Sequence, residues 1–154
     1  MKLLYTLVFM LTLSAYNVKA QSVTKQSLTL VKYNDNVTAP LTIKERSFIK
    51  EVYADKFEEY VMNRPQKLKD LKNLLRNRVL IRDMPDLINN PEKYTLLSET
   101  DLFNIYNSTL NFDKTYNKET FNVLKYNLQF FGRGSKVYRI DNTSYFIIIK
   151  SQHH

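Results

Sequence analysis

Four aspartates between residues 83 and 113 are the residues best suited to acid/base chemistry. Asp83 and Asp86 flank a Met-Pro pair, and Asp101 and Asp113 follow further along the chain. Glycoside hydrolases use two carboxylates, one as a general acid and the other as a base or nucleophile. The sequence therefore allows a carboxylate-dependent hydrolase of an envelope polymer or polysaccharide. Two of these aspartates would form the pair, with Asp83 and Asp86 as the first candidates.

A second candidate site is the basic stretch 64–82, which holds seven Lys or Arg residues and one acid. The chain has a formal net charge of +8, so this stretch carries most of the excess. Lys69, Lys72 and Arg76 fall on one side of a predicted helix and could bind phosphate, an acidic glycan or an anionic membrane surface. The alternative is a solvated helix face. The stretch lacks interleaved aromatic residues that stack on bases, so nucleic acid is not an expected partner.

Scarce residue types exclude several chemistries. The chain has no Cys, two His, which are its last two residues, and two Gly, at positions 132 and 134. Thiol chemistry, a Ser-His-Asp triad, a zinc site with several His ligands and a glycine-rich phosphate loop are therefore not expected. The sequence predicts no cofactor and no metal, assigns no catalytic residue, and favours a protein that is not an enzyme.

The first 20 residues follow the pattern of a signal peptide. Lys2 precedes an almost continuous apolar run over residues 3–13, and Val18-Lys19-Ala20 fits a cleavage site. The run is too short for a bilayer, which needs about 20 apolar residues, and no second such run follows. We therefore expect export to the periplasm or the extracellular space, with no transmembrane segment after cleavage.

The remaining chain is predicted to hold a leader over 21–40, with a strand over 27–33, and a single α+β domain over 41–154. Thr42 and Glu45 have the spacing of a capping box, in which the Thr hydroxyl accepts a first-turn amide and the Glu reaches back to the cap amide. This pattern predicts that a helix begins directly after Thr42.

The apolar spacing extends this first helix over 43–63 and leaves Glu51 on its hydrated face. A shorter helix is predicted after Pro65, followed by a strand at 79–81. Two Pro residues and an Asn-Asn pair then predict irregular structure over 83–94.

Further along, Ser98 predicts the start of a short helix over 98–107, and a short helix or turn is expected around 120–125. The Gly pair at 132 and 134 should turn the chain before a hairpin with strands over 136–140 and 145–150. The second of these strands has no polar residue between Tyr145 and Ile149. We expect it to be a central strand buried on both faces, the alternative being an edge that pairs with a second copy.

The dipeptide Tyr-Asn is unusually frequent. Its Tyr residues could stack on sugars, or they could wedge into the edge of the core while each Asn satisfies a turn. The five pairs begin at positions 16, 33, 106, 116 and 126.

The C-terminal part of the chain resembles the tail of a family of small, uncharacterised exported bacterial proteins. The resemblance rests on residues 121–128, 130–131, 138–143 and 145–150, and residues 74–79 show a weaker resemblance. It implies export and a C-terminal hairpin, and it assigns no functional residue.

Together these features predict an α+β fold in which two N-terminal helices pack on a small, mostly antiparallel sheet with a C-terminal β-hairpin. We expect a small exported protein that acts without catalysis, as a binding or structural accessory of the periplasm or cell surface. Its partner would be an envelope protein or a glycan, and the C-terminal strand could support a homodimer. The hydrolase and an anion binder that uses the 64–82 segment are the alternatives.

Overall fold

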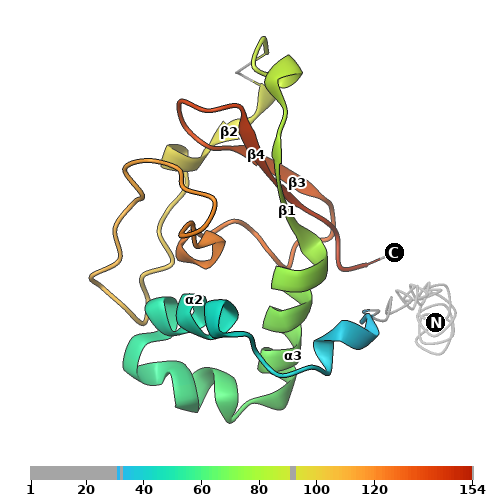
Figure 1. Cartoon of the computed structure of the whole chain (residues 1–154), viewed down its shortest axis with the longest axis vertical. Helices are drawn as coiled ribbons and strands as arrows, with labels where there is room; N and C mark the ends of the chain where they lie inside the picture. Colours follow the sequence, from blue (N-terminus) through green and yellow to red (C-terminus); the bar gives the residue numbers. More distant parts are fainter. Residues whose placement is uncertain (1–30, 32, 91–92, 154) are drawn as a thin grey trace, which may run out of the picture.

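The computed structural model describes residue 31, residues 33–90 and residues 93–153, and it gathers the main helices at one end of the molecule and a sheet at the other (Figure 1). The expected signal peptide and most of the expected strand over 27–33 lie outside the described residues. The elements are η2 Asp35–Val37, α2 Ile43–Tyr53, η3 Ala54–Lys56, η4 Glu58–Met62, α3 Pro65–Asn73, η5 Leu74–Arg78, β1 Val79–Asp83, η6 Pro85–Leu87, β2 Thr95–Leu96, η8 Leu97–Glu99, η9 Val123–Lys125, β3 Lys136–Arg139 and β4 Tyr145–Ile149.

Helix α2 begins where the capping box predicts. The Thr42 hydroxyl accepts the Glu45 amide at 3.1 Å, and the Glu45 carboxylate accepts the Thr42 amide at 2.8 Å. The prediction of one continuous helix to residue 63 is wrong, because Ala54 has a φ of +46° and interrupts the α-helical backbone. A 3-10 turn and a π-helical turn carry the chain onward, and Phe57 and Val61 still reach the core.

The second helix begins at Pro65, as predicted, because proline at the first helical position loses no backbone hydrogen bond. Helix α3 continues through the π-helical turn η5 directly into strand β1, without an intervening loop. The basic stretch 64–82 therefore runs without a break from the helical end of the molecule into the sheet.

The four-stranded sheet has the order β1-β4-β3-β2. Strand β4 is antiparallel to both β1 and β3, and the two-residue strand β2 is parallel to β3. The α+β fold and the C-terminal hairpin are thus confirmed, and the sheet is mixed through its shortest strand. Because β4 is paired on both sides, its own backbone offers no free edge.

The central strand is buried on both faces, as its composition predicts. Ile147 and Ile149 join the core shared with the helices, and Phe146, which points the other way, packs edge-on against Tyr94 at 5.1 Å between ring centroids. Phe146 and Ile147 are both fully inaccessible to solvent.

The predicted helix over 98–107 is wrong. Only the short turn η8 forms there, and the following residues run as an irregular segment that makes one bridge, between Leu102 and Tyr126. The Ser98 amide and hydroxyl both donate to the Asp141 carboxylate in the hairpin turn, so Ser98 ties two distant segments together and does not cap a helix. The 3-10 turn η9 confirms the short helix or turn expected around 120–125.

The chain turns before β3 without using the special freedom of glycine. Neither Gly132 nor Gly134 has a positive φ, whereas Gln129 and Asn142 do, at +46° and +53°. The left-handed residues therefore stand three residues before Gly132 and inside the hairpin turn.

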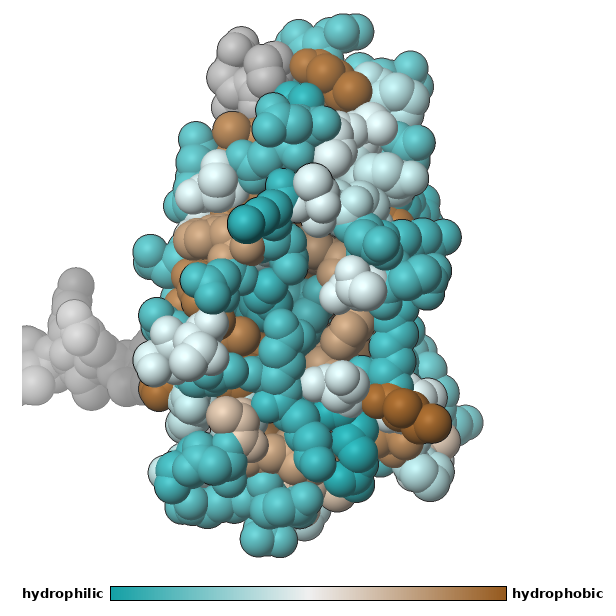
Figure 2. All heavy atoms as spheres, turned by 60° about the vertical axis from the view of Figure 1, so that its left-hand side comes forward, coloured by the Kyte–Doolittle hydropathy of each residue, from teal (hydrophilic) through white to brown (hydrophobic). Residues whose placement is uncertain are grey.

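In the described part of the chain, no helix has the length and apolar character that a membrane span requires. On the face shown in Figure 2, hydrophobic side chains lie in small separate groups among hydrophilic ones. This face therefore presents no broad apolar surface.

Candidate functional site

The four candidate aspartates are dispersed over the molecule. Asp83 ends β1 and Asp86 lies in η6, beyond the sheet, and both are exposed. Asp101 is also exposed, and its carbonyl accepts the Asn127 amide. Asp113 is half-buried in the long loop that precedes η9. Among the described residues, no hydrogen bond links any two of these four side chains.

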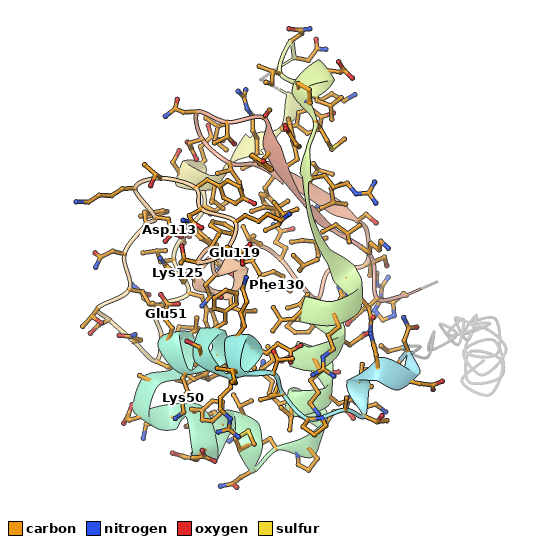
Figure 3. All side chains as sticks on the ribbon, viewed as in Figure 1. Lys50, Glu51, Asp113, Glu119, Lys125 and Phe130 are labelled. Carbon is orange, nitrogen blue, oxygen red and sulfur yellow. The ribbon has the colours of Figure 1, made fainter. Side chains whose placement is uncertain are left out.

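Asp113 belongs to a network around Lys125, whose side chain is only 8% exposed. The Lys125 ammonium lies 2.7 Å from one Asp113 oxygen and 4.0 Å from Glu51, while the Tyr126 hydroxyl donates to the other Asp113 oxygen at 2.7 Å. Figure 3 shows Asp113, Lys125 and Glu51 in a row that leads down to helix α2. The Asn122 side chain also donates to Glu51, at 2.8 Å.

The sequence gives no sign of this network, although Glu51 is exposed, as the helical periodicity predicts. Its members come from three distant segments, and no spacing along the chain connects them. Burial, followed by the hydrogen bond to Asp113, raises the pKa of Tyr126 well above its ordinary value, so the phenol keeps its proton and remains a donor. Both Asp113 oxygens are therefore occupied, and the network fastens the long loop to η9 and α2.

Asp113 and Asp141 also border a hollow of about 500 Å³ that is lined by both polar and apolar side chains. Two carboxylates beside one hollow would suit a hydrolase. However, Asp141 accepts both bonds from Ser98, and Asp113 is held by Lys125 and Tyr126. Both carboxylates therefore hold the loops around the hollow in place through these contacts.

The three predicted anion-binding residues have different surroundings. The Lys69 ammonium lies 4.2 Å from the centre of the Tyr33 ring, and Lys72 is buried to 8% exposure. Arg76 donates to both Glu45 oxygens, at 2.6 and 2.7 Å, and to the carbonyl groups of residues 36, 39 and 40. Of the three, only Lys69 is thus exposed, because Lys72 is buried and Arg76 is already bonded to Glu45.

The Arg76 contacts have a clear electrostatic consequence. The hydrogen bonds from Arg76 lower the pKa of Glu45, and this effect exceeds the opposing effect of burial. Arg76 thus fastens the segment before α2 against η5.

A mostly apolar pocket of about 290 Å³ lies where α2, α3 and the segment after η9 meet, and we call it the Lys67 pocket. It is lined by Val52, Tyr53, Lys67, Leu71, Leu74, Phe103, Leu124, Tyr126, Asn127, Gln129, Phe130, Phe131 and Gly132. Among the described residues of this lining, only Lys67 is charged.

Lys67 is held against aromatic rings. Its ammonium lies 5.4 Å from the centre of the Phe131 ring and 6.0 Å from that of Tyr53, within cation–π range. Burial lowers the pKa of Lys67 below its ordinary value of 10.5, against the favourable effect of Asp70 and with a smaller contribution from Arg64. In the sequence, nothing distinguishes Lys67 from the other bases of the stretch 64–82, and nothing indicates the pocket.

Arg78 fixes one wall of the Lys67 pocket. Its buried guanidinium donates to the carbonyl of Phe130 and, at 3.0 Å, to that of Lys150 at the end of β4. Figure 3 shows Phe130 between η9 and the α3–η5 helix. The Gly132 amide closes the turn by donating to the Gln129 carbonyl at 3.1 Å.

Two of the Tyr-Asn pairs serve the core edge and the turns. Tyr106 stacks on Tyr53 with 5.0 Å between ring centroids, while Asn107 accepts the Thr109 amide. In the next pair, Tyr116 packs edge-on against Phe121, and the Asn117 side chain accepts the amide of Glu119. These contacts favour the structural interpretation of both pairs over a sugar-binding surface.

The ranges that the structure describes contain no group of three or more His, Cys, Asp or Glu side chains that could hold a metal ion. Against known proteins, no family model, no curated protein and no solved structure matches this chain.

Proposed function

We propose that this chain is an exported binding protein without catalytic activity, and that it binds a small, largely apolar ligand in the Lys67 pocket. The observation that carries the proposal is the pocket itself, about 290 Å³ in volume and lined mainly by apolar side chains. Ligand sites in proteins are typically concave and apolar, with a few polar groups that fix orientation. The signal-peptide pattern supports the exported location.

The engaged carboxylates favour binding over hydrolysis. A glycosidase needs one carboxyl group free to donate a proton and a second free to act as base or nucleophile. Asp113 and Asp141 are both bonded to neighbouring side chains, while Asp83 at the end of β1 and Asp86 in η6 are exposed. Anion binding through Lys69, Lys72 and Arg76 remains a separate hypothesis, for which Arg76 would have to leave Glu45.

Calorimetric titration of the purified chain with 1-naphthol, a neutral and largely apolar probe with two fused rings, tests the proposal. We expect saturable binding that Asn127→Trp weakens at least tenfold, because Asn127 is an exposed residue of the pocket lining where a large ring would obstruct the pocket. Asn104→Trp is the matched control, since Asn104 is exposed and outside the pocket lining.

The control variant should bind the probe like the unmodified chain. Absence of saturable binding, or equal affinity in the Asn127→Trp variant, would overturn the proposal. Far-ultraviolet circular dichroism of both variants establishes that a change in affinity does not come from unfolding.

A further inference from the structure

We infer that the ligand of the Lys67 pocket is an amphipathic carboxylate, an apolar chain or ring system with one anionic head that meets the Lys67 ammonium. This inference rests on the proposed function, and it adds the chemical class of the ligand. It depends on where the single charge of the pocket stands relative to the apolar lining.

The lining divides into an apolar interior and a polar rim. Leu71, Leu74 and Leu124 are buried residues of the core, so they form an interior that favours hydrocarbon. Asn127 and Gln129 are exposed, and they supply the polar groups of the rim. A ligand with one apolar and one polar end matches this division.

The one charge of the described lining favours an anion. The lining contains Lys67 and neither Asp nor Glu, so an anionic head would meet an attractive charge and no carboxylate in the lining. A cationic head would be repelled by Lys67. Among the described residues, the Lys67 ammonium makes no ion pair within 4.0 Å, and it lies against the faces of Phe131 and Tyr53.

The surroundings of Lys67 leave its charge incompletely compensated. Asp70 stabilises the ammonium while Arg64 and burial oppose it, and burial is the largest of these effects. A ligand carboxylate that reaches the ammonium would replace water lost on burial with a charge-assisted hydrogen bond, which is among the stronger polar contacts in proteins. Binding and charge compensation would therefore occur together.

The volume of the Lys67 pocket limits the size of the apolar part of the ligand. A cavity of about 150 Å³ lined by aliphatic and aromatic side chains holds one benzene ring. The Lys67 pocket, at about 290 Å³, is roughly twice that size. It therefore has room for two fused rings or for a hydrocarbon chain of roughly eight carbons, estimated on the same scale.

Octanoate and octan-1-ol have the same number of carbons and differ in the head group. A difference between their affinities therefore measures the contribution of the carboxylate. Calorimetric titrations at pH 7 and low salt should show octanoate binding at least tenfold more tightly than octan-1-ol. In Lys67→Met, which keeps an apolar side chain of similar length, octanoate should lose at least tenfold in affinity while octan-1-ol keeps its own. Lys67→Arg should retain the preference for the acid.

Lys69→Met is the matched control, since Lys69 is a neighbouring base on the same helix outside the pocket lining. It should bind both compounds like the unmodified chain. Equal affinities for acid and alcohol, or a preference that survives Lys67→Met, would overturn the inference, and the proposed function would stand if the neutral probe still binds. If neither the probe nor octanoate binds, both proposals fall.

Discussion

At the level of single residues, Glu45 has two tasks. Its carboxylate accepts the Thr42 amide, which starts helix α2, and it pairs with Arg76 from η5 at 2.6 Å. Both side chains of the pair are less than 15% exposed. Because the pair is largely shielded from water, removal of one partner leaves the other charge poorly compensated and should cost more than the loss of an ion pair on the surface.

Glu45→Gln should remove the charge and preserve the capping box, because Gln can accept the same amide. We expect a loss of about 2 kcal/mol of unfolding free energy at pH 7, the scale of a hydrogen bond to a charged group. The pKa of Glu45 is lowered in the folded state, so its stabilisation is present above the ordinary value of 4.5 and disappears as the pH falls through the folded-state pKa. Urea unfolding at pH 7 and pH 3 should show the difference shrink.

Glu58→Gln serves as the comparison for Glu45→Gln. Glu58 is 65% exposed and lies 3.9 Å from Arg46, so its loss should cost less than about 0.5 kcal/mol. Equal losses in the two variants, or a Glu45→Gln effect that persists at acid pH, would contradict the account of the buried pair.

Gly134 does not use the conformations that only glycine favours. Its φ is not positive, and an added Cβ would meet no atom within 4 Å. Gly134→Ala should therefore stabilise the protein by about 0.4–1 kcal/mol, because alanine restricts the unfolded chain. Thermal unfolding should show a higher midpoint, whereas Asn142→Ala, at a φ of +53°, should lower it. A lower midpoint for Gly134→Ala would contradict the backbone geometry.

At the level of elements, Arg78 joins three parts of the chain. It ends the helical connector, and its guanidinium reaches the Phe130 carbonyl beside the Lys67 pocket and the Lys150 carbonyl after β4. A backbone bond from the Lys150 amide to the Arg78 carbonyl lies beside these contacts. The side chain therefore couples the pocket wall to the end of the central strand β4.

Arg78→Met should leave both carbonyl groups without their side-chain donor while it preserves most of the apolar contact. Since bonds from a charged donor contribute about 1.5–3 kcal/mol each, we expect a loss of at least about 2 kcal/mol in urea unfolding. Amide exchange at Gly132, next to the freed wall, should become faster. A variant of unchanged stability and unchanged exchange at Gly132 would show that Arg78 does not hold this wall.

Local signals in the sequence predicted the elements that local contacts determine. The helix capped by Thr42, the helix that begins at Pro65 and the terminal hairpin all form where expected. The break at Ala54 and the loss of the helix after Ser98 could not be predicted, because Ala54 has an unfavourable backbone conformation and Ser98 bonds to a partner 43 residues away. These two features depend on the tertiary fold.

The candidate site was less predictable than the fold. Its lining runs from Val52 to Gly132, with apolar residues whose patterns indicate only that they are buried. Lys67 differs from the neighbouring Lys69 only in the side chains that the fold packs against it. The sequence therefore locates the positive charge, and the tertiary structure separates one cation at a pocket from others engaged with Tyr33 and Glu45.

At the level of the whole molecule, one core connects the helical end to the sheet. A single cluster of buried side chains includes Ile49 of α2, Leu74 of η5, Leu128 of the segment after η9 and Ile147 of β4. The pocket sits within this shared core rather than between two independent bodies. Because the elements have no separate cores, we expect the domain to unfold in one cooperative step.

Ile147→Ala tests this cooperativity, because Ile147 is fully buried in the central strand. Truncation of a buried Ile typically costs about 2–5 kcal/mol through lost burial and a new cavity. Far-ultraviolet circular dichroism, which follows the helices, and tyrosine fluorescence, which follows the packed aromatic rings, should shift together to one lower urea midpoint. Ile105→Ala, at a site 74% exposed, should change the midpoint little. If the circular dichroism transition instead stayed behind at its original midpoint, the helices would be stable without the sheet, and the pocket they share could open without global unfolding.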